Sequence, residues 1–316
     1  MSQFHPSRTA FLGRPVKRLS GYLSIPVGSR THVVAWLIAA AATLAAILPT
    51  TSASAQTTLY VSGTMHIESS PDRWPDPVAL VDFFTRATAA GSGSGRATGM
   101  RWSVGADIGW LRNEPAAAAV IAATEDLGVE WDIHAHNAAD RPECYVKIRD
   151  LGGSPNRVAS GLLVSEIDAL RRARTASDGT RWGAQVLWGL VVSAGHGPGS
   201  DDRAFGVWRP RNSTDWKRHA PSGSLIAVGG GGRTLDSTTD FALGLAAGTV
   251  GRGEPISSAT INVAPDTLRV VDTTDGIDEI EAWADTMALL PLVQWATIRE
   301  TAADWAAAGG VPSRVE

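Results

Sequence analysis

The sequence predicts an α/β fold in which residues 56–316 form a (β/α)7–8 barrel, TIM-like whether regular or distorted. Segments of strand length alternate with segments of helical periodicity, as in parallel sheets whose strands are joined by helices. The number of such units, about eight, favours a closed barrel over an open doubly wound sheet. No G-x-G-x-x-G segment, which is typical of a dinucleotide-binding fold, joins a strand to a helix.

The expected strands are rich in β-branched and aromatic residues and are bounded by turn residues. They cover 59–68, 100–108, 129–136, 158–164, 185–192, 205–208, 225–228, 259–263 and 292–298. In a barrel of this kind the chemistry takes place at the carboxyl ends of the strands. Functional residues are therefore expected where these segments end.

The expected helices lie between the strands. Pro75 and Pro77 open the first helix, Gly128 ends an alanine-rich one, and Gly309 ends the last. The helices cover 75–87, 115–127, 143–151, 165–174, 237–247, 277–289 and 299–308. Because no internal repeat or obvious linker interrupts this alternation, we predict a single domain after the N-terminal segment.

The first 55 residues are typical of a secretion signal. They hold five basic residues and no acidic one, then a 16-residue apolar run at 33–48, then Ala53-Ser54-Ala55. A charged start, a short apolar stretch and an A-x-A site are the parts of a signal peptide, and the apolar run is shorter than the about 20 residues of a spanning helix. We predict that 1–55 is cleaved, leaving a secreted or periplasmic protein without stable membrane insertion. The alternative is an uncleaved segment that anchors the protein in a membrane.

The composition of residues 56–316 excludes several function classes. They carry 23 basic and 32 acidic residues, a net charge of −9, so nucleic acid is not an expected partner. The one cysteine, Cys144, allows no intramolecular disulfide and has no histidine beside it to make a thiol nucleophile. No G-x-S-x-G segment supports serine catalysis. The 11 tryptophans supply core volume, although sugar-binding clefts also use such rings.

Three of the five histidines in this part of the chain lie at expected strand ends. Residues two apart on a strand face the same side, so His134 and His136 point together, as do His66 and Glu68. If both strands point these residues inward, four ionisable groups meet at the barrel mouth, which is costly unless a metal ion or hydrogen bonds compensate. Imidazole and carboxylate are suitable ligands for Zn²⁺. We predict a divalent metal site here, with a metal-free hydrogen-bonded cluster as the alternative.

Other polar residues near strand ends have two interpretations each. Asp107 follows the second strand and could orient a histidine or act as a base, or could cap a loop or helix. Glu300 follows the last strand, where an acidic residue in the first turn of a helix is stabilised by the helix dipole. Gly229–Gly232 could bind an anion through backbone amides, but a tight strand-to-helix turn explains this segment better.

The segment 193–210 is long and irregular, and such loops at strand ends often form binding walls. It contains His196 and Asp201, which we predict to contact substrate. Trp208 offers a flat ring that suits a sugar, and Arg209 offers a guanidinium that could orient a carboxylate.

Taken together, these segments resemble the polysaccharide deacetylase superfamily, the chitooligosaccharide deacetylase-like barrels. The resemblance spans most of 58–308 and depends on three segments: the strand end Gly-Thr-Met-His-Ile-Glu at 63–68, the strand end Asp-Ile-His-Ala-His at 132–136, and Trp-Arg-Pro at 208–210. It implies a distorted (β/α) barrel, export from the cell, and removal of acetyl groups from a cell-surface or extracellular glycan with the help of a divalent metal.

The motifs differ from those of the superfamily at several positions. His66 and Ile67 stand where the family has two aspartates, and Glu68 could replace the missing carboxylate. The histidines are spaced H-x-H where the family has H-x-x-x-H. The late Leu-x-x-His motif is absent, His219 being the last histidine.

The resemblance implies a set of roles for a hydrolase. His134 and His136 bind the metal, and Glu68 or His66 is the third ligand. Asp107, or whichever of the other two is not a ligand, takes the proton from the attacking water. Carbohydrate is the expected substrate.

Three other functions remain open at this level. A glycoside hydrolase on the same barrel would use two carboxylates, Glu68 with Asp107 or Glu300, and no metal. An inactive barrel would bind glycans without turnover. An amidohydrolase-type barrel would carry its H-x-H on the first strand, whereas here it follows the third.

Overall fold

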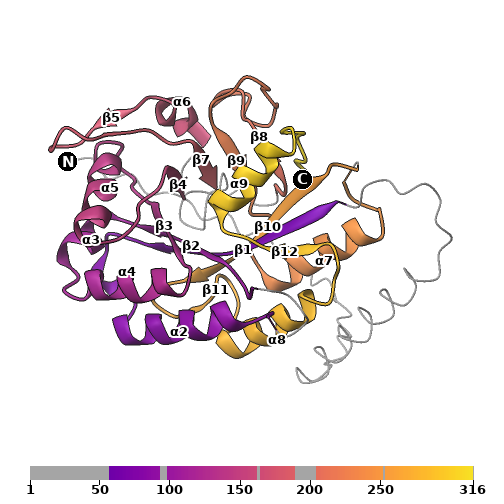
Figure 1. Cartoon of the computed structure of the whole chain (residues 1–316), viewed down its shortest axis with the longest axis horizontal. Coiled ribbons are helices and arrows are strands. Elements are labelled where there is room, and N and C mark those ends of the chain that lie inside the picture. Colours follow the sequence, from indigo (N-terminus) through magenta and orange to yellow (C-terminus); the bar gives the residue numbers. More distant parts are fainter. Residues whose placement is uncertain (1–56, 93–97, 162–163, 189–203, 252, 316) are drawn as a thin grey trace, which may run out of the picture. The chain divides into compact units, whose positions relative to one another are not determined.

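One mixed β-sheet is the main element of the computed structural model, which describes residues 57–92, 98–161, 164–188, 204–251 and 253–315 (Figure 1). Within these residues the sheet has ten strands: β1 (Thr58–Ile67), β2 (Trp102–Ala106), β3 (Glu130–Ile133), β4 (Val158–Ser160), β7 (Val186–Trp188), β8 (Val207–Trp208), β9 (Ile226–Val228), β10 (Ile256–Ala264), β11 (Arg269–Val270) and β12 (Val293–Trp295). Nearly all of them overlap a segment that the alternation of the sequence predicts, and β11 is the exception.

The strand order is β11-β10-β1-β2-β3-β4-β7-β9-β8, with β12 attached to β1. The pairs from β10 to β9 are parallel, and the two edge strands, β11 and β8, run antiparallel to their neighbours. The chain therefore has the mostly parallel sheet and helical connections of an α/β protein.

The predicted (β/α)7–8 barrel, however, is wrong. β1 pairs with β10 along one edge, and β12 (at Leu59–Val61) and β2 (at Gly63–Ile67) share the other edge. The last strand, β12, therefore does not close a ring of strands between the first and the last strand of a barrel. The sheet instead curls into an open half-barrel. Isolated backbone hydrogen bonds, such as Gly206 N–H to the Ser258 carbonyl at 2.9 Å, join its two sides in place of a strand ladder. The arrangement is closer to the open sheets of flavodoxin-like and Rossmann-like folds.

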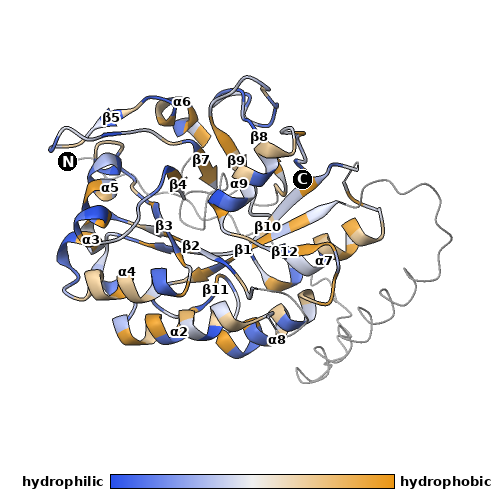
Figure 2. Ribbon diagram, in the orientation of Figure 1, coloured by the Kyte–Doolittle hydropathy of each residue, from blue (hydrophilic) through white to orange (hydrophobic). Residues whose placement is uncertain are grey.

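The larger helices are α2 (Pro77–Ala89), α4 (Ala117–Asp126), α5 (Asp140–Asp150), α7 (Leu235–Ala246), α8 (Ile277–Met287) and α9 (Ile298–Ala307). Helices α2, α4 and α8 lie along the lower side of the view, where each carries both hydrophobic and hydrophilic residues (Figures 1 and 2). Their apolar residues pack inward: Phe83 and Phe84 of α2 contact the edge of Trp102 on β2. Such a two-sided helix is stabilised by burial of one stripe against the sheet.

Helix α9 packs against the beginnings of the strands, inside the curl of the sheet. Its Ile298, Ala302 and Trp305 form one buried cluster with residues that start β1 and β7, among them Tyr60 and Val186. This apolar plug fills the amino-terminal end of the half-barrel.

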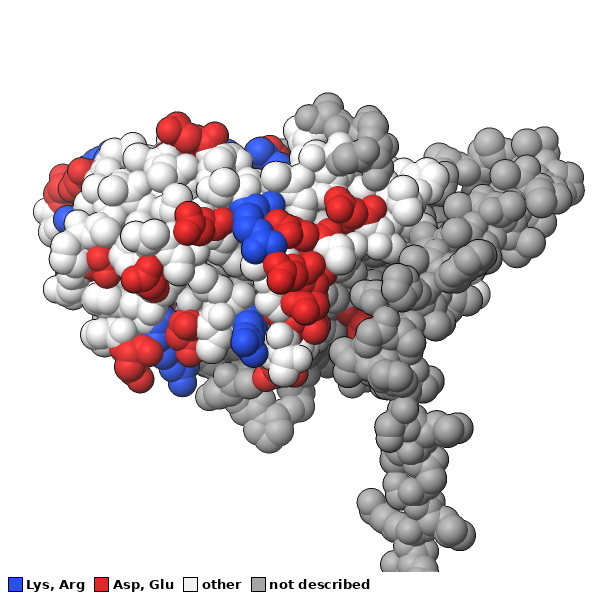
Figure 3. Space-filling view, turned by 90° about the horizontal axis from the view of Figure 1, so that it is seen from below, with Lys and Arg blue, Asp and Glu red and all other residues white. Residues whose placement is uncertain are grey.

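Short elements complete the described part: a 3-10 turn η2 (Pro71–Arg73), α3 (Ile108–Asn113), η3 (Val164–Glu166), α6 (Ile167–Leu170) and a hairpin of β5 (Arg174–Thr175) and β6 (Arg181–Trp182). The predicted secretion signal, His196 and Asp201 lie outside the described residues, and the single domain over 56–316 stays a prediction. Among the helices that the structure describes, none has both the length and the apolar character needed to cross a bilayer. Acidic groups outnumber basic ones on the face seen from below (Figure 3).

Candidate metal centre

The register of three neighbouring strands brings the candidate residues to one level. β1 pairs with β2 as Ile67 with Ala106, and β2 pairs with β3 as Ala106 with Ile133. The next residues along these strands are Glu68, Asp107 and His134, and their backbones stay connected: Asp107 N–H donates to Ile67 and His134 N–H to Ala106. Residues in register on parallel strands face the same side. The predicted meeting of the first and third strands at this end of the sheet is confirmed.

Glu68, His134 and His136 converge on one point. The Oε2 atom of Glu68 lies 3.2 Å from Nε2 of His134 and 2.9 Å from Nε2 of His136. The three potential ligand atoms all lie within 4.8 Å of one another. In a tetrahedral zinc site with bonds of about 2.0–2.1 Å, ligand atoms are about 3.3 Å apart. The two separations from Glu68 are close to this value, and this group could hold a metal ion.

The hydrogen bond at Nδ1 of His134 decides which ring nitrogen carries the proton. Its Nδ1 lies 3.1 Å from the carbonyl oxygen of Ser160. A carbonyl only accepts, so Nδ1 carries a proton and donates it, and in a neutral ring Nε2 then has a lone pair. That lone pair faces the Glu68 carboxylate, so a proton or a cation must lie between the two atoms. Donation from the second ring nitrogen to a backbone carbonyl is also how metal-bound histidines are held in proteins.

The carboxylate of Glu68 is kept ionised in this setting. Burial acts to raise the pKa of Glu68, but hydrogen bonds with His134 and His136 outweigh burial and hold its pKa far below the usual range. The same contact raises the pKa of His136, against the effect of burial. Together, a half-buried carboxylate that stays charged and two imidazoles are a suitable set of ligands for a divalent ion.

His66 lies next to this group, but in a stack instead of among the potential ligands. Its ring is stacked against His134, with centroids 4.6 Å apart, and against Trp188, at 4.4 Å. Trp188 is held in turn by the hydrogen bond from its Nε1–H to Asp132 Oδ2, 3.0 Å long. Burial, followed by the nearby His134, holds the pKa of His66 well below its ordinary value, so the ring is neutral at pH 7. Its buried Nε2 has no hydrogen-bond partner in the described part of the chain.

Two glycines make room for these rings. Gly161, at φ +64, follows β4, and a Cβ there would lie 2.7 Å from Cε1 of His134 and 2.8 Å from Cε1 of His66. A Cβ on Gly105 of β2 would lie 2.0 Å from the Ser160 hydroxyl oxygen. The two imidazoles can therefore stack only because Gly161 lacks a side chain, whereas Gly105 leaves room for Ser160.

Asp107 caps a helix beside the metal group. Its Oδ1 accepts the Gly109 N–H at 2.7 Å and caps α3, which is one of the two interpretations that its position allowed. Burial raises the pKa of Asp107, and the charges of His134 and His136 act against this. Asp107 borders the metal group without being one of its three members.

The structure places the remaining predicted residues away from this centre. Trp208 is fully buried, and its Nε1–H donates to the Trp216 carbonyl at 2.8 Å, so its ring offers no face to a sugar. The guanidinium of Arg209 donates to the Gly223 carbonyl at 2.9 Å and lies 5.3 Å from the Trp305 ring centroid. Both residues therefore contribute to packing near the C-terminal helix.

The structure confirms that Glu300 belongs to a helix start and that 229–232 is a strand-to-helix turn. Glu300 accepts the Thr297 N–H at 2.8 Å in the capping box of α9 and pairs with Arg101 at 2.9 Å. The glycines at 229–232 form the turn into α7, which Thr234 caps. Cys144 is buried, which raises the pKa of its thiol and leaves it unreactive.

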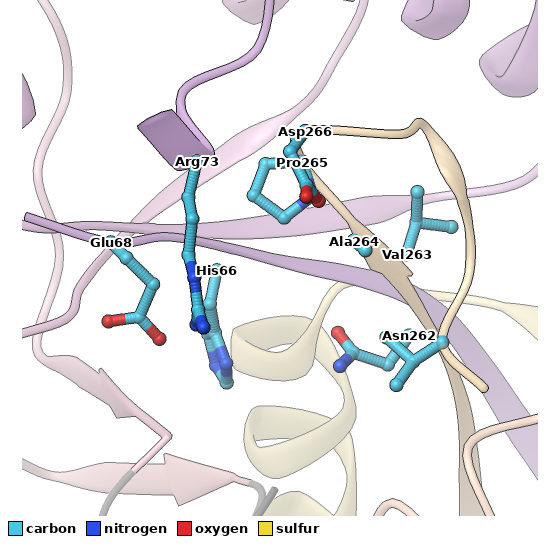
Figure 4. A pocket seen from close by; sticks show the side chains of 9 residues that line it. His66, Glu68, Arg73, Asn262, Val263, Ala264, Pro265 and Asp266 are labelled. Atoms are coloured by element: carbon cyan, nitrogen blue, oxygen red, sulfur yellow. The ribbon is translucent and has the colours of Figure 1, made fainter. Parts of the chain in front are cut away.

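A cavity of about 230 Å³ opens beside Glu68 and His66 (Figure 4). Its other walls come from η2, through Arg73, and from the end of β10 with the β10–β11 turn; they are Asn262, Val263, Ala264, Pro265, Asp266 and Val271. No pattern in the sequence marks these residues as functional. Arg73 had only its position, five residues after a strand end, to mark it, and Asn262 is one of several polar residues on a strand.

No protein-family model matches the sequence, and neither the curated proteins nor the solved structures give a match. The resemblance to polysaccharide deacetylases therefore stays a prediction from the motifs.

Proposed function

We propose that this protein is a metal-dependent hydrolase whose ion is bound by Glu68, His134 and His136. One observation carries the proposal: three ligand atoms converge at the carboxyl ends of β1 and β3, and they lie next to an open cavity. Two histidines and one carboxylate, with a further position left for water or substrate, are typical of catalytic zinc. Zn²⁺ is therefore the ion we expect.

A bound Zn²⁺ ion would polarise a substrate carbonyl and lower the pKa of a bound water. The chain's own residues would do the rest. Ser160, through its carbonyl, fixes the ring of His134 so that Nε2 faces the ion. His66 is neutral, borders the cavity and has an unpartnered Nε2, so we assign it as the group that accepts the proton of the attacking water.

The metal-independent glycoside hydrolase has less support. It needs two carboxylates on either side of the scissile bond. Glu68 is engaged by two histidines, and Glu300 belongs to the other end of the sheet, where Thr297 of the same capping box contacts Glu130 at the start of β3. Export from the cell and an acetylated glycan as substrate remain part of the proposal on sequence grounds alone.

Metal content is the direct test. Protein purified without a histidine tag should contain close to one equivalent of metal by elemental analysis, and His134→Ala and Glu68→Gln should each remove it. His219→Ala is a matched control, since His219 contacts Arg209 and Trp305, away from this centre. Release of acetate from acetylated chitooligosaccharides should stop with a chelator and return with Zn²⁺.

Two results would overturn the proposal. A wild-type protein that binds neither Zn²⁺ nor another divalent ion would leave a hydrogen-bonded cluster. Stoichiometric Fe²⁺ would instead assign the two histidines and one carboxylate to oxygen chemistry, for which the same ligand set is also used.

A further inference from the structure

The cavity beside the metal group has one wall that the proposed chemistry does not use. Residues of η2 hold Arg73 there: Trp74, next to it, donates its Nε1–H to the Glu68 carbonyl at 2.9 Å, and Arg73 N–H donates to Ser70. The turn is thus fastened to the end of β1. Figure 4 shows the Arg73 side chain extending into the cavity, between Glu68 and Pro265 in this view.

The Arg73 guanidinium has no counter-ion in the described part of the chain. Several other arginines of the structure pair with a carboxylate, such as Arg86 with Glu281 and Arg101 with Glu300. Asp266 lines the same cavity, but the two side chains form no ion pair within 4.0 Å. An arginine without a partner, directed into a cavity, has its five N–H donors available to a ligand.

Two further polar residues, His66 and Asn262, line the cavity. His66 is half-buried, and its buried Nε2 has no partner among the described residues. Asn262 is buried, and its amide is fixed on one side by the Thr64 hydroxyl, 3.3 Å away. Buried polar atoms without partners are rare in folded proteins, so the Nε2 of His66 points to a ligand or a water molecule that supplies what the protein does not.

The charges in the cavity favour an anion when the metal is bound. A divalent ion and Arg73 contribute three positive charges, and Glu68 and Asp266 contribute two negative ones. One positive charge remains uncompensated. Arginine binds carboxylate and phosphate groups through two parallel hydrogen bonds, which suits both charge and shape.

We propose that this cavity is a subsite for an oxyanion group, a carboxylate or a phosphate, that Arg73 binds next to the metal ion. The proposal rests on the metal-dependent function proposed above and narrows its substrate to a small acidic molecule or an acidic sugar. A cavity of about 230 Å³ is smaller than the about 300–1,000 Å³ of pockets for drug-sized ligands, so it suits one compact unit.

Calorimetric titration of acetate and of inorganic phosphate, in separate arms, into metal-loaded protein tests the subsite. We expect at least one of them to bind, and Arg73→Met to weaken that binding at least tenfold while metal content stays unchanged. Arg73→Lys should recover part of the affinity, since it restores the charge without the paired donors. Arg174→Met, at an exposed arginine on β5, is the matched control and should bind as wild type does.

The subsite proposal fails if neither anion binds wild type, or if Arg73→Met binds as tightly as Arg174→Met. Binding of phosphate alone or of acetate alone, lost in Arg73→Met, supports the proposal and identifies the group. If wild type binds no metal, the proposed function fails separately. The same anions are then titrated into the metal-free protein, where dependence on Arg73 still decides the subsite.

Discussion

Replacing Gly161 by alanine should lower both the free energy of unfolding, through backbone strain, and the metal affinity, through contact with the histidine rings. At φ +64 a residue with a Cβ is strained by about 1–2 kcal/mol. The new Cβ would also lie 2.7 Å from Cε1 of His134 and 2.8 Å from Cε1 of His66. Ordinary contact begins at 3.4 Å, so the rings or the β4 turn must move by about 0.6–0.7 Å. Functional sites tolerate displacements of about 0.5 Å, so we expect metal affinity to fall at least tenfold.

Gly179→Ala is the matched control for this change. Gly179 has φ +87, but its Cβ would have no atom within 4 Å, so it has the backbone strain without the contact. Urea unfolding of the metal-free proteins should show a loss of about 1–2 kcal/mol for Gly179→Ala and a somewhat larger loss for Gly161→Ala. Competition with a chelator should show weaker metal binding for Gly161→Ala alone. Equal metal affinity in the two variants would refute the steric argument.

Two other predictions test the fold around the centre. Burial and Asp304 raise the pKa of Tyr60 to about 12. The stability that this group contributes is therefore complete below about pH 10 and lost as the pH rises toward about 12. Between about pH 9 and pH 11 the urea midpoint should fall less in Tyr60→Phe than in wild type, and an equal fall would contradict the assignment. Trp208 is fully buried, so Trp208→Ala should lower the free energy of unfolding by about 3–5 kcal/mol and leave metal content unchanged; a stable variant with impaired sugar binding would instead support the substrate-binding role that the sequence predicts.

The metal group was within reach of the sequence because its signals are local. H-x-H after a strand, and His-x-Glu at the end of another, each depend only on the two-residue period of a strand. The one long-range assumption was that the two strands end at the same edge, and parallel pairing through β2 fulfils it. The contacts of Trp188 and Gly161 with His66 could not be predicted in this way, because they depend on the curl of the sheet.

The sequence could not predict whether the sheet closes or what role a single aromatic residue has. A strand pattern does not say which edge a strand joins, and β12 joins the edge of β1 that β2 also uses. Trp208 belongs to a strand of two residues, too short for alternation to tell a buried ring from an exposed one. Arg73 lies on a 3-10 turn, which has no periodic signal at all.

The central position of β1 has a consequence for how the protein acquires its ion. Although every proposed ligand belongs to the first half of the chain, β1 is hydrogen-bonded to β10 and β12, and the contact of Thr64 with Ile261 joins residues 197 positions apart. Pairing over such separations is slow and needs the complete polypeptide. A nascent or truncated chain that ends before β10 therefore has all three ligands but lacks two of the three strands that flank β1. Metal loading should be among the last events of maturation.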